Sequence, residues 1–449
     1  MSPPSAPASP APSDPSSSPT RTPDCAIDFE GQSVPAVAGE PVAVALFASE
    51  VRVLSRSIKY HRPRTFFCLS GHCGACLMRI DGQPNVKACR ALCRPSLQVE
   101  RQNAFPSVGF DVLEAADFFF PRGMDHHTMF TSPRPLNVLM QKVVRELGGL
   151  GKLPDQAPPT LPAGERLRVD VVIVGGGPAG LAAATAIRRA RPTASVLLVD
   201  EADRVGGSLL SWPGAGPGDG LRSAQRLENE ARQAGVELRT SATALAWYPE
   251  DEGGLLAIDD HGHLVRVRAQ RYIYATGGYE TNLLFGNNDR PGILAARAVG
   301  LLLSRYGVMA GRRPVIVGQG AYAEALAQAL GRAGAEVTHV DGERVRAVAA
   351  HGNTWVRRLD VEEGGQTRRL RCDLVAVAAT PAPATDLPRQ HGAQVLLTPA
   401  GGGFACQVRE DGQTESPGVY ACGDVCGYRG PAAAQEDGER VGRAVAASL

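Results

Sequence analysis

Four cysteines within one short stretch are the residues best suited to carry chemistry in this chain. Cys68, Cys73, Cys76 and Cys89 are separated by four, two and twelve residues. This is the plant-type spacing of ligands for a [2Fe–2S] cluster, in which thiolates hold two sulfide-bridged irons. A structural zinc site is the alternative, although zinc more often takes paired C-x2-C units. We therefore expect the four thiols to bind a [2Fe–2S] cluster.

A glycine-rich turn predicts a second kind of site, for a dinucleotide. The apolar run 169–174 ends at Gly175, and good helix formers follow Gly180, which is typical of a strand, a tight turn and a helix. In such a turn Gly175 permits the bend, Gly177 lets the backbone approach a pyrophosphate, and Gly180 allows close packing of helix and strand. The diphosphate would lie at the helix N-terminus, where free N–H groups favour an anion.

Acidic residues at the end of the next strand strengthen this interpretation. The apolar run 195–199 is followed by Asp200 and Glu201, one of which should hold a ribose hydroxyl. The spacing to the following glycine pair, which ends at Gly207, slightly favours Asp200. That glycine pair lies where flavoproteins bring backbone close to their cofactor, so the expected dinucleotide is FAD.

Two later turns have the form of further flavin contacts. Thr276 and Gly277 end an apolar strand in a Thr-Gly turn, which typically closes the first flavin-binding segment. Gly423 and Asp424 follow the last strand in a Gly-Asp motif, and Asp424 is expected to contact the ribityl chain or phosphate of FAD.

A second glycine turn predicts a second dinucleotide fold. The run 314–317 leads into Gly318 and Gly320 in a G-x-G-x-x-A pattern, and Asp341 ends the next strand. An acid at that position suits the unphosphorylated ribose of NAD. The alternative is a duplicated fold that persists as scaffold with an empty pocket, so NAD remains a possible cofactor here.

Length and composition bound the remaining choices. The chain has 449 residues, a net charge of +1 and no apolar run long enough to span a membrane, which argues against nucleic acid as a partner and against a transmembrane segment. The cysteines are clustered rather than spread as a disulfide framework, so we expect a cytoplasmic protein. The expected divisions are a disordered Pro/Ser-rich tail (1–24), a ferredoxin-like domain (25–101), a connector (102–166), FAD-binding parts (167–290 and 381–449) and an NAD-binding-like domain (291–380).

Three segments outside the motifs resemble one family. SIKYHRPR at 57–64, QNAFPS at 102–107 and FPRGMDHHTMF at 120–130 resemble the N-terminal part of the α subunit of heterotetrameric sarcosine oxidase. Related proline, hydroxyproline, opine and cyanide-forming glycine dehydrogenase complexes have similar parts. The resemblance extends over about residues 26–449. The leading domain of sarcosine oxidase α subunits generally lacks the cluster, so the four cysteines place this chain closer to the dye-linked dehydrogenases.

The resemblance implies a fold and a function. The fold would be α/β and multi-domain, with an N-terminal β-grasp ferredoxin-like domain and two Rossmann-type domains, the second inserted in the first. The chain would be an electron-transferring subunit carrying FAD and a [2Fe–2S] cluster. Its substrate would be oxidised on a separate D-amino-acid-oxidase-like flavoprotein subunit, and an electron acceptor would complete the system. Because the chain stops at Leu449, we expect no C-terminal folate-dependent or cluster domain.

Some roles stay open at this stage. No residue is assigned as catalytic, because the cofactors carry the redox chemistry. A self-contained NADH-dependent reductase and a non-catalytic electron-conducting scaffold are the rival functions. In the connector, His126 and His127 are interpreted as surface or interface histidines, and the apolar pair Phe119 and Phe120 as part of a docking surface.

Overall fold

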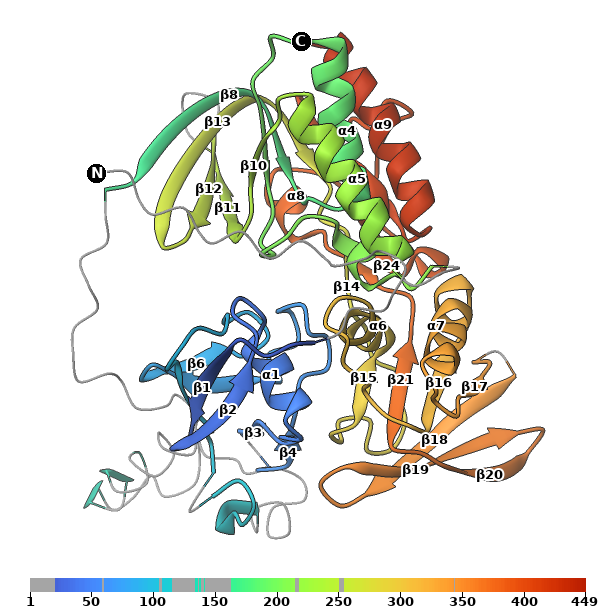
Figure 1. The fold of residues 1–449 in the computed structure, drawn as a ribbon. Helices are drawn as coiled ribbons and strands as arrows, with labels where there is room; N and C mark the ends of the chain where they lie inside the picture. Colours follow the sequence, from blue (N-terminus) through green and yellow to red (C-terminus); the bar gives the residue numbers. More distant parts are fainter. Residues whose placement is uncertain are drawn as a thin grey trace. The chain divides into compact units, whose positions relative to one another are not determined.

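The computed structural model divides the chain into two compact units. It describes residues 21–58, 60–104, 107–114, 163–214, 218–249, 254–342 and 344–449, with a few isolated positions between 134 and 141. Unit 1 combines residues 1–157 with 283–378, and unit 2 combines 158–282 with 379–449. Residues 283–378 are thus inserted between the two segments of unit 2, and the colours of Figure 1 follow this order along the chain.

The N-terminal part of unit 1 is a five-stranded sheet with one helix packed on it. The strand order is β2-β1-β7-β5-β6. The elements are β1 (Cys25–Phe29), β2 (Gln32–Ala36), α1 (Val42–Ala48), β3 (Ser55–Arg56), β4 (Pro63–Arg64), β5 (Leu77–Ile80), β6 (Gln83–Lys87), β7 (Gln98–Glu100) and the 3-10 turn η1 (Val112–Glu114). Helix α1 is apolar on every side and almost wholly buried, and the Phe47 ring packs edge-on against Phe66 at 5.3 Å. The cysteine loop runs from this core to β5.

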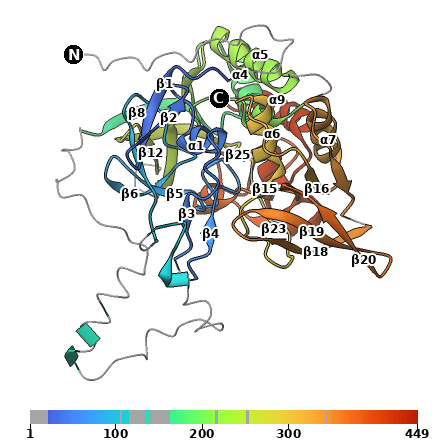
Figure 2. The ribbon, with the colours of Figure 1, turned by 60° about the horizontal axis from the view of Figure 1, so that its bottom comes forward.

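The second part of unit 1 is a parallel sheet of the Rossmann type. Its order is β15-β21-β16-β17, and all three pairings are parallel. The elements are β15 (Ile293–Ala295), α6 (Ala296–Ser304), β16 (Pro314–Gly318), α7 (Ala321–Arg332), β17 (Thr338–Val340) and β21 (Leu374–Ala378). A separate antiparallel sheet of β18 (Val345–Gly352), β19 (Val356–Glu363) and β20 (Gln366–Arg371) lies next to it (Figure 2).

The two parts of unit 1 are joined by specific contacts. The Arg64 guanidinium donates to the Asp289 carboxylate at 2.7 Å and to its carbonyl at 3.0 Å. The N–H of Ala295 donates to the carbonyl of Phe67 at 3.0 Å. Trp355 precedes β19, and its ring lies 6.0 Å from the Phe47 ring. These contacts place the start of the cysteine loop at the carboxyl end of β15.

Unit 2 is built on a seven-stranded sheet. The order is β10-β9-β8-β13-β12-β11, and β25 pairs with β13. The sheet strands are β8 (Glu165–Val174), β9 (Val196–Val199), β10 (Glu237–Arg239), β11 (Ala242–Tyr248), β12 (Leu255–Asp260), β13 (His263–Tyr274) and β25 (Val419–Ala421). Helices and turns are α4 (Pro178–Ala190), η2 (Gly207–Ser211), α5 (Asp219–Gln233), α8 (Asp386–Gln390), η3 (Pro399–Gly401), η4 (Gly423–Cys426) and α9 (Pro431–Ala447). Two small sheets pair β14 (Gly278–Tyr279) with β22 (Ala382–Pro383) and β23 (Val395–Thr398) with β24 (Gly403–Cys406).

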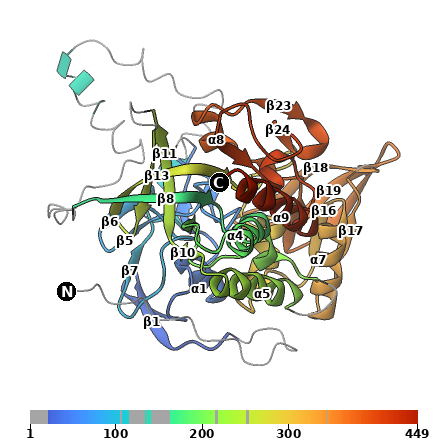
Figure 3. The same cartoon turned by 90° about the horizontal axis from the view of Figure 1, so that it is seen from above.

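Small residues let the first and last helices of unit 2 pack closely. Figure 3 shows α4 and α9 side by side. A Cβ added at Gly438 would lie 2.0 Å from the carbonyl oxygen of Ala179, and one at Gly442 would lie 2.5 Å from that of Ala183. Real Cβ atoms do not approach so closely, so α9 can reach α4 because it carries glycine at this spacing. The contact holds α9 against the glycine turn that opens α4.

The predicted fold class is confirmed: a ferredoxin-like part precedes two Rossmann-type folds, the second inserted in the first. One limit differs from the expectations. Arg21, assigned to the disordered tail, donates to the buried Glu40 carboxylate. None of the helices in the described parts of the chain is long and apolar enough to cross a membrane.

Candidate functional site

The structure brings the four predicted cysteines together as two pairs. The thiol of Cys73 hydrogen-bonds to Cys68, which lowers the pKa of Cys68 and raises that of Cys73. The thiol of Cys89 hydrogen-bonds to Cys76 in the same way, and this raises the pKa of Cys89. Cys68, Cys76 and Cys89 are buried, while Cys73 is exposed. Each pair therefore places two sulfur atoms within reach of one iron.

Backbone N–H groups of the loop point at these sulfur atoms. The N–H groups of Ser70 and Cys73 each donate to Cys68 Sγ at 3.4 Å, and that of Gly71 hydrogen-bonds to Cys89. Gly71 has φ +91°, a conformation that favours glycine. Such donors stabilise thiolate and sulfide charge, which is how proteins tune iron–sulfur clusters.

The four thiols form two pairs, as the two irons of a [2Fe–2S] cluster require. Within the described residues, no three His, Cys, Asp or Glu side chains are grouped so that they could hold a single ion. The nearby Cys93 is buried next to Glu40 and Cys25, and burial raises the pKa of its thiol. Cys93 therefore lies in a different environment from the four loop cysteines.

The three glycines of the first turn have different roles in the structure. A Cβ on Gly175 would lie 2.2 Å from the carbonyl oxygen of Ala275, and one on Gly180 would lie 1.9 Å from that of Gly175. Both are required by packing. Gly177 caps α4 with φ −73°, and its added Cβ would meet nothing nearer than Gly207 Cα at 3.9 Å. The space in front of Gly177 is therefore open, as an approaching diphosphate requires.

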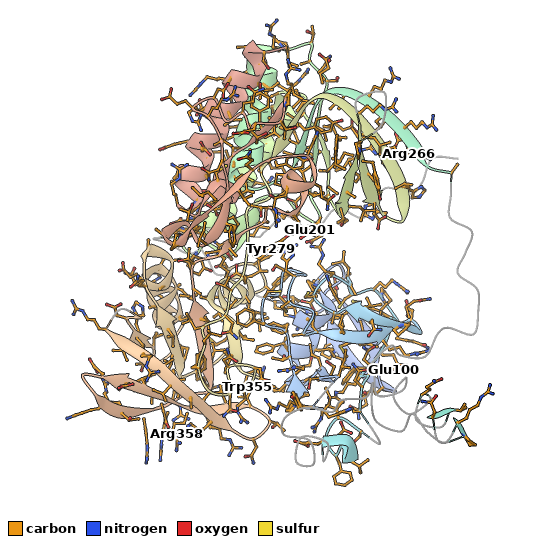
Figure 4. The ribbon with its side chains drawn as sticks, turned by 180° about the vertical axis from the view of Figure 1, so that it is seen from behind. Glu100, Glu201, Arg266, Tyr279, Trp355 and Arg358 are labelled. Atoms are coloured by element: carbon orange, nitrogen blue, oxygen red, sulfur yellow. The ribbon has the colours of Figure 1, made fainter. Side chains whose placement is uncertain are left out.

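The two candidate ribose acids are placed differently. One Asp200 carboxylate oxygen accepts from the N–H of Gly176 at 2.6 Å, and the other accepts from Ala202 at 2.7 Å. Asp200 is therefore fixed against the glycine turn, where carboxylate oxygens can accept a further bond from a ribose hydroxyl. Glu201 lies near Tyr279 (Figure 4). This geometry favours Asp200, as the spacing does.

The turn at Thr276 and Gly277 is tied to the β22 end of unit 2. The Thr276 hydroxyl donates to the carbonyl of Ala384 at 2.7 Å, and the carbonyl of Gly277 accepts from the N–H of Ala384 at 2.9 Å. The hydroxyl proton is thus used within the protein, while the hydroxyl oxygen and the backbone of the turn can still accept or donate to a flavin.

The Gly-Asp turn is held by a residue that sequence reasoning missed. The N–H of Gly423 donates at 2.8 Å to Asp437, a buried carboxylate of α9 that also pairs with Arg440. Asp424 itself is buried in η4, and its Oδ1 lies 3.4 Å from the N–H of Arg429. The sequence signal that could have indicated Asp437 is an acidic residue in the following helix, fourteen positions after Gly423.

Tyr279 is a second polar residue of unit 2 that the motifs did not indicate. Its hydroxyl donates to Asp386 at 2.7 Å. Burial, the hydrogen bond to Asp386 and the charge of Glu201 raise the pKa of Tyr279, so it stays protonated at neutral pH. No sequence pattern links these three residues, which lie far apart in the chain.

The second glycine turn resembles the first in having one tightly packed and one open glycine position. A Cβ on Gly318 would lie 2.3 Å from the carbonyl oxygen of Ala378, and one on Gly320 would meet nothing within 4 Å. Asp341 directly follows β17, the position of a ribose acid. His339, which the motifs did not indicate, donates from Nε2 to the carbonyl of Gly318 at 2.9 Å. The predicted histidines at 126 and 127 and the phenylalanines at 119 and 120 lie outside the described residues.

Two family models match the chain, one over the cysteine loop and one over the glycine turns. Residues 24–104 match the 2Fe-2S iron-sulfur cluster binding domain. Residues 169–345 and 341–447 match the pyridine nucleotide-disulphide oxidoreductase family, to which the chain belongs. It is therefore an oxidoreductase, and its cofactors are FAD and a [2Fe–2S] cluster.

Two curated proteins and one crystal structure are similar to this chain over much of its length. The chain is 29% identical to the α subunit of sarcosine oxidase from Rhizobium meliloti (strain 1021), over 91% of this chain and 45% of that protein. It is 27% identical to an opine oxidase subunit from the same strain, over 62% of this chain and 71% of that one. The crystal structure of L-proline dehydrogenase from P. horikoshii has the same fold, with a TM-score of 0.70, 22% identity and coverage of 93% of this chain and 72% of that one. The chain thus spans about half the length of its sarcosine oxidase relative.

Proposed function

We propose that this chain is the α-type, electron-transferring subunit of an amine or amino-acid dehydrogenase or oxidase complex. The observation that carries the proposal is the combination of paired cysteines and a flavin-type Rossmann fold in one chain. Similarity to a sarcosine oxidase α subunit extends over 91% of the present chain and so includes both parts.

The proposed ligand sets follow from the geometry. Cys68 and Cys73 would hold one iron, Cys76 and Cys89 the other, with the loop N–H groups offsetting the negative charge. The FAD residues would be those of the first glycine turn, the acid that faces it and the two later turns. They are Gly175, Gly177, Gly180, Asp200, Gly207, Thr276, Gly277, Gly423 and Asp424, with Glu201 as the second acid. When bound, the flavin would exchange one or two electrons and the cluster one electron at a time.

The proposed partner is a D-amino-acid-oxidase-like flavoprotein subunit that oxidises the substrate. Two relatives are themselves subunits, one of a sarcosine oxidase and one of an opine oxidase, which supports both a hetero-oligomer and an amine or amino-acid substrate. A cytoplasmic location is part of the same proposal, because none of the ten cysteines is paired in a disulfide.

A second function has its own supporting observation. The turn at Gly318 and Gly320 keeps the open approach of a nucleotide site, and Asp341 is placed to hold an NAD ribose. A self-contained NADH-dependent reductase would use this site as its electron entry. If the chain is instead the electron-transferring subunit, the same site binds NAD, but NADH does not supply the electrons for the reaction.

Anaerobic reduction distinguishes the two functions. We expect NADH to leave the flavin absorbance of the loaded chain largely unchanged on the timescale of turnover. Sarcosine, proline, hydroxyproline or glycine should bleach it when the flavoprotein partner is present and not with the chain alone. Fast bleaching by NADH alone would favour the reductase, and amino-acid oxidation by the isolated chain would defeat the subunit proposal.

A further inference from the structure

Two hydrogen bonds, joined through peptide bonds, connect the second nucleotide turn to the cysteine loop. Tyr322 is the second residue of α7, directly after the turn, and its hydroxyl donates to the carbonyl of Ala296 at 3.5 Å in a buried position. Ala296 is the first residue of α6. The preceding residue, Ala295, donates its N–H to the carbonyl of Phe67 at 3.0 Å, and Phe67 is bonded to Cys68. All of these residues belong to unit 1.

The sheet places both ends of this connection at one edge. Ala295 pairs with Val377 of β21, and Gly318 of β16 pairs with the next residue, Ala378. β15 and β16 are each one strand away from β21, so the Phe67 contact and the nucleotide turn are about 10 Å apart, two strand spacings. Both lie at the carboxyl ends of parallel strands, where ligands of such sheets bind.

The expected direction of the nucleotide leads toward the cysteine loop. Asp341, on the β17 side, marks the adenine ribose, so the rest of a dinucleotide would extend across β21 toward β15. A nicotinamide gives up two electrons as a hydride, whereas a [2Fe–2S] cluster takes one. Direct reduction of the cluster from this site is therefore not balanced, and a different role fits the position.

The cysteine loop is also attached to the second part of unit 1 by further contacts. Arg64 is bonded to Asp289, which lies shortly before β15. Phe47 packs between Phe66, two residues before Cys68, and Trp355 of the second part. A change at the start of α6 is thus transmitted to the loop rather than absorbed by a flexible joint.

We propose that an adenine dinucleotide bound at Gly318 and Gly320 is an effector of the [2Fe–2S] cluster, acting through Tyr322 and the Ala295–Phe67 hydrogen bond. The inference rests on the proposed nucleotide site. The diphosphate brings negative charge to the edge at which the loop is attached, which disfavours adding an electron to the cluster. Binding also orders the turn that carries Tyr322. The effector therefore shifts the reduction potential of the cluster to more negative values.

Thermodynamic linkage gives a reciprocal effect that can be measured separately. If the nucleotide lowers the potential, the oxidised protein must bind it more tightly than the reduced protein. ADP-ribose is the probe, because it carries the adenine, both riboses and the diphosphate but has no nicotinamide to be reduced. On FAD-loaded, cluster-loaded protein we expect it to bind roughly fivefold or more tightly before dithionite reduction than after it.

The test combines equilibrium dialysis with an EPR-monitored redox titration. ADP-ribose should shift the midpoint of the cluster signal to more negative potential in the unaltered protein. Tyr322→Phe keeps the ring and removes the hydroxyl, so it should still bind ADP-ribose and show a much smaller shift. Tyr420→Phe, which alters a tyrosine of unit 2, is the matched control and should retain the full shift. Asp341→Ala should weaken both binding and shift.

Each contrary outcome has a distinct meaning. Binding of ADP-ribose with no change in midpoint overturns the effector role and leaves the nucleotide site standing. An undiminished shift in Tyr322→Phe overturns the route through Tyr322. Binding and shift that survive Asp341→Ala place the ligand elsewhere and overturn the inference. Absence of binding removes the proposed nucleotide site together with its effector role.

Discussion

Replacing Gly177 by valine should give a folded chain that keeps its cluster and lacks FAD. Gly177 has φ −73° and ψ −176°, an extended conformation that valine adopts without strain. Its added Cβ meets nothing nearer than 3.9 Å within the protein. The side chain would instead occupy the space that we assign to the diphosphate. The affinity for FAD should fall by about tenfold or more, because even ~1.4 kcal/mol of lost binding free energy has that effect, and the purified protein should lose flavin accordingly.

A neighbouring glycine and a distant one supply the controls. Gly180→Val should lose both flavin and folded unit 2, because its Cβ would collide with the Gly175 carbonyl oxygen at 1.9 Å. Gly331→Val, at an open position inside α7, should keep flavin and fold. The measurements are flavin and iron content together with thermal unfolding. A Gly177→Val protein with full flavin would contradict the assignment of the turn.

Cys76→Ser should remove the cluster and leave FAD bound. Cys76 is fully buried and hydrogen-bonded to Cys89, so its loss leaves the second iron with a single thiol from its pair. Iron and acid-labile sulfide should fall from about two each per chain to near zero, and the rhombic EPR signal of the reduced protein should disappear. Flavin content should be unchanged, because the FAD residues belong to unit 2.

Cys93→Ser is the matched control for this loss. It removes an equally buried thiol that is close in sequence and faces Glu40 and Cys25 instead of the loop. Its iron and sulfide should equal those of the unaltered chain. Unchanged iron in Cys76→Ser, or zinc in place of iron in the unaltered chain, would show that the ligand assignment is wrong.

The parts of the site that the sequence could predict are set by local geometry. A strand that ends in Gly175 and continues as a helix after Gly180 has few possible shapes, since each glycine removes a specific backbone collision. The cysteine loop is similar, because its spacing and its glycines together determine where the sulfur atoms and N–H groups point. The choice of Asp200 over Glu201 also followed from spacing.

Contacts between segments that are distant in the sequence could not be predicted from local sequence patterns. Arg64 and Asp289 are 225 positions apart, and no periodicity links Phe67 to Ala295. Tyr322 looks like an ordinary residue in the first turn of a helix until the start of α6 is placed beside it. The Thr276 hydroxyl illustrates the same limit, because its use by Ala384 depends on packing 108 positions later in the chain.

As part of the proposed function, electrons from an amino acid reach the cluster through the FAD of this chain. Rapid freeze-quench EPR on the complex with its flavoprotein partner tests it most directly. After addition of the amino acid, the signal of the reduced cluster should grow within the time of one turnover in the unaltered complex. It should be absent or far slower when the chain carries Gly177→Val. Equally fast cluster reduction in the flavin-free variant would contradict the claim.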